Sequence, residues 1–173
     1  MQHWLNVTAL VLGVVARIAL WIAGISLVAM TALIAAQVFF RYVVRSPLTW
    51  TEPSSILLMG WFILLGAAVG TREGYHLSFD VVLMVVPQRV VLILHSLSDI
   101  VVAGFGGGMA WFGYELLTRT WTATMPTLGL PGGVAFIPLT LSGVLIVIFS
   151  VERLVRRAAG MKTARFGDEL TEE

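Results

Sequence analysis

The sequence predicts an all-α integral membrane protein with four transmembrane helices. Of its 173 residues, 58% are hydrophobic and only 12% are charged, whereas soluble domains carry about 25% charged residues. Four long apolar runs follow one another, and most polar residues collect between them. Because a backbone in lipid must satisfy its hydrogen bonds internally, each run is expected to be helical.

The first span is expected at residues 18–40, which corresponds to about 34 Å of helix against roughly 30 Å of hydrocarbon. Residues 1–17 mix apolar and polar side chains and are predicted to form an interfacial segment leading into this span. A signal peptide is the rival interpretation. It is disfavoured because the following run is too long and ends in arginines. The second span is expected at residues 53–71, with a proline in its first turn.

The second half of the chain supplies two further spans, at residues 90–114 and 134–151, separated by a loop rich in Pro, Gly and Thr. The apolar run at residues 77–86 is too short to cross a bilayer, so a short interfacial helix is expected there. Residues 152–173 are predicted to form a polar tail. The membrane domain therefore covers residues 18–151.

The distribution of basic residues predicts the orientation. The N-terminus, the second connection and the tail hold eight Lys and Arg residues, and the first and third connections hold three. Because cytoplasmic loops carry the excess of positive charge, both termini are expected in the cytoplasm. A net charge of +1 gives no reason to expect a nucleic-acid partner, and the absence of cysteine excludes disulfides and thiolate metal sites.

No pattern in the sequence predicts a catalytic, metal or cofactor site. There is no phosphate-binding loop, nucleophile–base pair or spacing of metal ligands. A membrane haem needs two facing imidazoles. Of His3, His76 and His95, only His95 lies in a predicted span, so no cofactor is expected. No residue can be named as a substrate contact.

Asp99 is the only acidic residue well inside a predicted span, which makes it a candidate for a proton or ion site. The competing interpretation is a carboxylate satisfied by local hydrogen bonds from Ser96 and Ser98. Trp61 lies in the middle of its span and is expected to anchor packing against another helix. Two small-xxx-small pairs are expected to allow close helix packing, namely Gly66 with Gly70 and Gly104 with Gly108.

Charged and aromatic residues mark the turn between the first two spans. Arg41 and Glu52 flank it, and Trp50 lies within it. Arg41 and Glu52 are close enough in sequence to pair across the turn. Alternatively, Glu52 faces a partner protein. For Arg41 and Arg72, a structural pairing role competes with extension to lipid headgroups, which long side chains reach from helix ends.

These residues also carry a resemblance to a known family. The chain resembles the small, DctQ-like membrane subunit of tripartite ATP-independent periplasmic (TRAP) transporters over about a quarter of its length, and departs from the pattern at Pro53, where a second acidic residue is expected. The matching residues are Arg41, Tyr42, Pro47, Trp50, Glu52, Trp61, Leu65, Gly66, Ala67, Ala68, Arg72 and, one residue later than in the pattern, His76.

The resemblance implies an accessory subunit in the bacterial inner membrane. It implies two protein partners, a large multi-span membrane subunit and a periplasmic substrate-binding protein, in sodium-coupled uptake of an organic acid. The motif residues Arg41, Trp50, Glu52, Trp61, Gly66, Arg72 and His76 would then serve subunit contacts or structure.

Two other functions remain open from the residues alone. A membrane anchor of a respiratory oxidoreductase would need facing histidines for haem. A small homo-oligomeric exporter would need an essential acid in a span, a role that only Asp99 could fill.

The predicted orientation can be tested with single cysteines, since the chain has none of its own. A cysteine replacing Ser46 should react with an impermeant thiol reagent added outside the cell, and one replacing Ser78 should not. The reverse labelling pattern would overturn the orientation.

Overall fold

The computed structural model describes the backbone of residues 2–74 and 88–159, and the side chains of residues 7–74 and 94–159. The fold class is confirmed, because four helices are long and apolar enough to cross a membrane. They are α1 (Gln2–Phe39), α2 (Thr51–Glu73), α4 (Gln88–Arg119) and α5 (Ile137–Ala158). Two short elements border them, a π-helix η1 (Phe40–Val44) and a 3-10 helix η3 (Gly132–Phe136).

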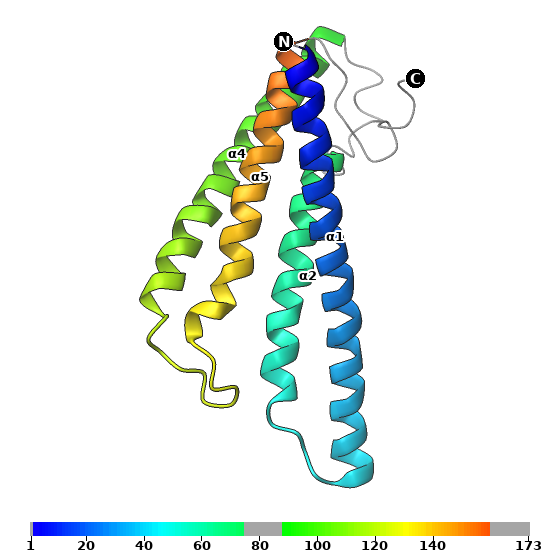
Figure 1. The fold of residues 1–173 in the computed structure, drawn as a ribbon, viewed down its shortest axis with the longest axis vertical. Coiled ribbons are helices and arrows are strands. Elements are labelled where there is room, and N and C mark those ends of the chain that lie inside the picture. Colours follow the sequence, from blue (N-terminus) through cyan, green and yellow to red (C-terminus); the bar gives the residue numbers. More distant parts are fainter. Residues whose placement is uncertain (1, 75–87, 160–173) are drawn as a thin grey trace.

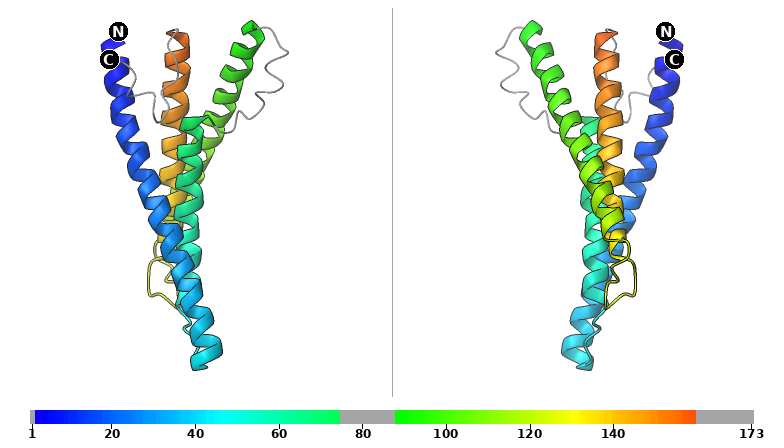
Figure 2. Two further views of the ribbon diagram at one scale, coloured as in Figure 1. Left: turned by 90° about the vertical axis from the view of Figure 1, so that its right-hand side faces the viewer. Right: turned by 90° about the vertical axis from the view of Figure 1, so that its left-hand side faces the viewer.

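The four helices form two antiparallel hairpins, α1–α2 and α4–α5, joined mainly through contacts between α2 and α5. The start of α1 and the end of α5 lie at the same end of the molecule, which is called the terminal end. The opposite end, with both turns, is called the turn end (Figure 1). Figure 2 shows α1 and α4 spreading apart at the terminal end, on either side of α5. The middle helices α2 and α5 therefore connect two outer helices that barely meet.

Three predicted boundaries differ from the observed ones. α1 runs without a break from Gln2, so the division between residues 17 and 18 is not a break in the helix. α4 continues to Arg119 and α5 to Ala158, so residues 152–158 belong to a helix and not to a tail. The predicted boundaries followed the first polar residues, but a helix can continue past them when those side chains find partners. The predicted interfacial helix at 77–86 lies outside the described residues, and the membrane position of residues 1–17 stays a prediction.

Local chemistry explains where α2 begins and ends. The Thr51 hydroxyl donates to the Leu48 carbonyl at 2.7 Å, and Pro53 sits in the first turn, where a helix needs no N–H donor. At the other end Gly74 has φ 76°, a left-handed conformation that closes the helix. α2 is therefore 23 residues long, which gives about 34 Å of helix and matches the hydrocarbon thickness.

Small residues build the contact among α1, α2 and α5. Ala16, Ala19 and Ala23 on α1 are buried against side chains of the other two helices. Those partner residues are Leu65, Ala68 and Val69 on α2 and Leu145, Ile146 and Phe149 on α5. Trp61 is half-buried and packs on this core. Alanine allows helix backbones to approach closely where lipid offers no hydrophobic driving force.

Glycines build the contact between α4 and α5, but they are not the predicted pair. A Cβ at Gly143 would lie 2.5 Å from the Ala110 nitrogen, and one at Gly113 would lie 2.8 Å from the Thr140 hydroxyl oxygen. By contrast, a Cβ at Gly104 or Gly108 would meet nothing within 4 Å. The same holds for Gly66 and Gly70. Within this chain, the predicted small-xxx-small pairs are therefore not the packing glycines.

The spacing of residues on α4 explains this correction. Asp99, Gly106 and Gly113 follow one another at seven-residue intervals and are all buried, so they lie on one stripe of the helix. This stripe faces α5, because Gly106 and Gly113 contact Ile146 and Thr140 there. Gly104 and Gly108 lie on a different face. The position of the buried Asp99 therefore identifies the face of α4 that packs on α5. The run of glycines from 104 to 108 does not identify it.

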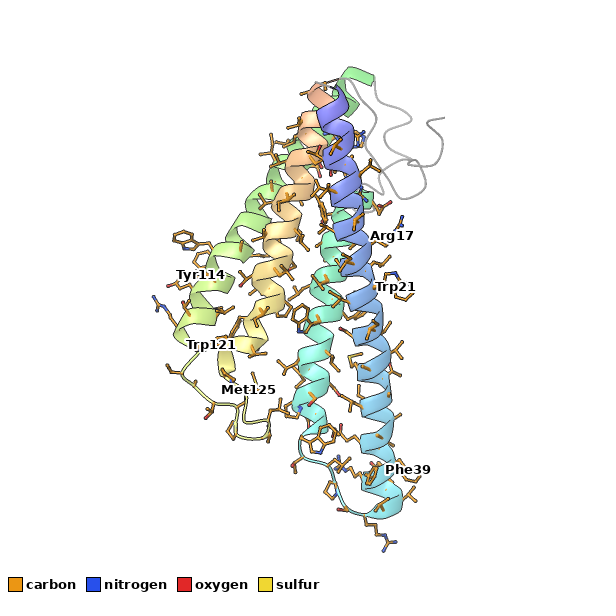
Figure 3. All side chains as sticks on the ribbon, viewed as in Figure 1. Arg17, Trp21, Phe39, Tyr114, Trp121 and Met125 are labelled. Carbon is orange, nitrogen blue, oxygen red and sulfur yellow. The ribbon has the colours of Figure 1, made fainter. Side chains whose placement is uncertain are left out.

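Much of the apolar surface faces outward. Trp21 on α1, Phe105 and Trp111 on α4 are each more than two-thirds exposed. Figure 3 shows Trp21 on the side of α1 that faces away from the other helices, and Tyr114 on the outer side of α4. Such a surface suits contact with lipid or with another membrane protein.

Replacement of Gly143 by leucine should lower the free energy of unfolding by about 1–3 kcal/mol, because the added side chain has no room between α4 and α5. Thermal unfolding of the purified chain in detergent measures this effect. Gly108→Leu is the matched control and should leave the isolated chain nearly unchanged. Equal losses in both variants would show that the α4–α5 contact is placed wrongly.

Candidate functional site

Seven charged residues near the terminal end form one cluster at the level where α2 ends. The cluster comprises Arg72 and Glu73 on α2, Asp99 on α4, and Glu152, Arg153, Arg156 and Arg157 on α5. We call it the arginine cluster. All seven side chains are at least 85% buried within an otherwise apolar set of helices.

Asp99 lies in the contact between α4 and α5, near the terminal end. Its side chain is 0% exposed, and its two oxygens face two different arginines. Arg153 Nε lies 3.3 Å from Oδ1 and Arg157 Nη1 lies 2.8 Å from Oδ2. Arg157 also donates to the Ser96 hydroxyl at 3.3 Å. Both oxygens of this carboxylate are occupied by guanidinium groups, so Asp99 is poorly suited to bind a sodium ion.

Arg153 extends this contact from α4 and α5 to α2. Its Nη1 donates to the Thr71 carbonyl at 2.7 Å. This is one of the last carbonyls of α2, and it also accepts the Gly74 N–H at 3.2 Å. A Cβ at position 74 would lie only 3.0 Å from Arg153 Nη1. Glycine at this position therefore both closes α2 and leaves room for the guanidinium group.

Arg72 connects α2 to α1. Its side chain is 1% exposed, and its Nη2 donates to the Ala9 carbonyl at 3.2 Å. Its Nη1 lies 3.9 Å from a Glu73 carboxylate oxygen. Arg72 therefore has a structural role within the protein and does not extend to lipid headgroups.

The remaining two members of the cluster lie one turn apart on α5. Arg156 Nη1 is 3.9 Å from the Glu152 carboxylate, and both side chains are less than one-tenth exposed. They share a stripe of α5 with Phe149 and Leu145, which pack on α1 and α2. The arginines of α5 thus lie on two of its faces, one towards α4 and one towards α1 and α2.

The predicted residues of the first turn lie at the opposite end of the molecule. Arg41 is exposed in η1, with its guanidinium carbon 6.0 Å from the centre of the Tyr42 ring. Trp50 is 45% exposed and precedes α2 directly. Glu52 is exposed in the first turn of α2. Among the residues whose side chains are described, no ion pair joins Arg41 to Glu52.

Glu52 lies instead in a groove between α1 and α2. The groove has a volume of about 190 Å³. Its lining consists of Met30, Ile34 and Gln37 from α1 and Glu52, Ser55, Ile56 and Met59 from α2. We call it the α1–α2 groove. Its lining is apolar except for Glu52, Gln37 and Ser55.

Other predicted site residues are scattered. Trp61 and Gly66 lie in the middle of α2, far along the helix from Glu52 and from Arg72. His76 lies outside the described residues. In the part of the chain whose side chains are described, no group of three or more His, Cys, Asp or Glu residues is arranged to hold a metal ion.

Sequence reasoning missed Arg153, Arg156 and Arg157, because they follow the last apolar run and were counted as tail charges. A signal for them was available. Asp99 needs a cation at its own depth in the membrane, and Arg153 and Arg157 recur on one face of a helix at i and i+4. That spacing favours a continued helix with an inward basic face.

Comparisons with known proteins agree with the resemblance in the sequence. A family model described as "Tripartite ATP-independent periplasmic transporters, DctQ component" matches residues 30–160. The chain is 27% identical over 146 residues to a putative TRAP transporter small permease protein of Haemophilus influenzae, covering 79% of this chain and 86% of that one.

Two further relatives match over shorter stretches. The chain is 31% identical over 61 residues to the C4-dicarboxylate TRAP transporter small permease protein DctQ of Vibrio cholerae, covering 35% of this chain. It is 30% identical over 70 residues to the sialic acid TRAP transporter permease protein SiaT of H. influenzae, covering 40% of this chain. These matches span about a quarter of the first relative (26%) and 11% of the second.

Asp99→Asn should lower the free energy of unfolding by about 3–5 kcal/mol, because it leaves two buried arginines without their counter-charge. Thermal unfolding in detergent provides the measurement. The double variant Asp99→Asn with Arg157→Gln should lose less than the sum of the two single variants. Glu115→Gln removes an exposed pair with Arg119 and should cost about 0–1 kcal/mol. Additive losses at Asp99 and Arg157 would contradict the observed pair.

Proposed function

We propose a role for this chain on the premise that it belongs to the DctQ component family of the tripartite ATP-independent periplasmic transporters. The chain is thus a multi-pass membrane subunit of a transporter and not an enzyme. Its proposed role is that of an accessory scaffold, which supports a large membrane subunit in the sodium-coupled uptake of an organic acid.

The arginine cluster is the observation that carries the scaffold role. A subunit that moved an ion or substrate itself would present charged groups to a cavity near the middle of the membrane. Here the buried charges bind one another and a helix-end carbonyl, and thereby connect α1, α2, α4 and α5. Such contacts fix helices relative to each other, which is what a brace requires.

The similarity to SiaT supports a large membrane subunit as the partner of this chain. The match to SiaT, named as a permease protein, covers only 11% of that protein, so a segment similar to this chain is a small part of a much longer permease. When such a segment is a separate chain, we expect it to bind a large membrane subunit non-covalently. Exposed apolar side chains on α1 and α2, among them Ile34, Ile56 and Met59, provide area for this contact.

The proposed orientation places the terminal end in the cytoplasm and the turn end in the periplasm, on the basis of the distribution of Lys and Arg. The turn with Trp50 and the loop before η3 would then face a periplasmic substrate-binding protein. Two relatives are named for C4-dicarboxylate and for sialic acid. Both compounds are organic acids, which supports this class of cargo.

The two alternative functions receive less support. The family consists of transporter components, which argues against a respiratory anchor. An exporter would need Asp99 to be free for protons or ions, but two arginines occupy its oxygens.

Uptake in membrane vesicles tests this role. Vesicles that contain the large subunit, the binding protein and this chain should accumulate an organic acid when a sodium gradient is imposed. Vesicles lacking only this chain should show at least a tenfold lower rate, and the large subunit should co-purify with the tagged chain. Full uptake without this chain, or no co-purification of any large membrane subunit, would refute the scaffold role.

A further inference from the structure

The α1–α2 groove has the shape of a binding site for another helix. Its α1 residues, Met30, Ile34 and Gln37, recur at intervals of four and three. Its α2 residues, from Glu52 to Met59, recur in the same way over two turns. Residues at these intervals form parallel ridges along each helix, and a third helix packs into the groove between such ridges.

The side chains that line the groove suit an apolar partner that carries one cationic group. Two methionines and two isoleucines form most of its surface, and methionine adapts its shape to partners. The Ser55 hydroxyl already donates to the Thr51 carbonyl at 2.8 Å. Glu52 and Gln37 therefore remain as the polar groups available to an incoming side chain.

Glu52 lacks a counter-charge within the described part of the chain. Arg41, the basic residue predicted across the turn, lies over the Tyr42 ring instead. The three buried carboxylates of the described side chains, Glu73, Asp99 and Glu152, each have an arginine partner. A carboxylate that becomes covered at a helix contact is costly unless it gains a cation.

We infer that the α1–α2 groove binds a transmembrane helix of the large subunit, and that this helix places a Lys or Arg against Glu52. The inference rests on the proposed function and specifies which surface makes the contact. A membrane helix provides the long apolar ridge that the groove fits. Anionic lipid is disfavoured, because its phosphate would meet the Glu52 carboxylate.

Co-purification of the large subunit with tagged variants of the full chain tests the inference. Glu52→Lys should lower recovery about tenfold or more, because it replaces an attractive charge contact by a repulsive one. Ile34→Trp, which fills the groove, should also lower recovery. Thermal stability of the isolated chain should stay unchanged for Glu52→Lys, since this side chain is exposed and makes no contact that holds the fold.

Two matched controls isolate the effect. Val28→Trp adds the same side chain to the opposite, 70% exposed face of α1 and should leave recovery unchanged. Glu115→Gln removes a carboxylate at the turn end of α4 and should also leave it unchanged. A photoreactive residue at Met59 should crosslink to a large-subunit helix that carries a basic residue.

The outcomes separate this inference from the proposed function. Wild-type recovery for Glu52→Lys and Ile34→Trp would overturn the groove while leaving the scaffold role intact. Crosslinks from Met59 only to lipid, or only to the periplasmic protein, would also overturn it. Loss of the scaffold role itself would appear differently, as failure of the wild-type chain to recover any large subunit.

Discussion

The pair of contacts that Asp99 makes with Arg153 and Arg157 is the interaction on which the arrangement of the helices depends. In water, replacing a buried ion pair by apolar side chains often costs nothing. In lipid the comparison changes, because apolar side chains gain little by leaving hydrocarbon for a helix contact. The ion pairs therefore select which faces of α4 and α5 meet, and Arg153 transmits this selection to α2 through the Thr71 carbonyl.

The glycines depend on the same contact. Asp99 places one stripe of α4 against α5, and Gly106 and Gly113 then fall at the closest approach with Gly143. At the end of α2, Gly74 leaves space for the Arg153 guanidinium. Charge and small size thus act together, since a guanidinium group can reach a helix-end carbonyl only where no side chain blocks it.

The two ends of the molecule consequently differ in character. At the terminal end, the arginine cluster is bound within the chain and connects all four helices. At the turn end, Glu52 lies in a groove, and Trp50 and Arg41 are exposed. A transporter scaffold needs this division, because its internal contacts must hold its shape while its outer contacts remain available to a partner.

The sequence by itself determined the fold class, the four spans and the family. Apolar runs of about twenty residues can satisfy their backbone in lipid only as helices, and the motif from Arg41 to Arg72 identified the family independently of any contact. Only the tertiary structure decided which face of each helix packs. Gly104 and Gly108 were predicted to pack, and Gly106, Gly113 and Gly143 do so instead. Arg153, Arg156 and Arg157 were assigned to a tail and are buried. The reason is physical: span positions follow from the transfer of each segment into lipid, a local property, whereas the rotation of a helix is set by partners distant in sequence, such as Asp99 and Arg153.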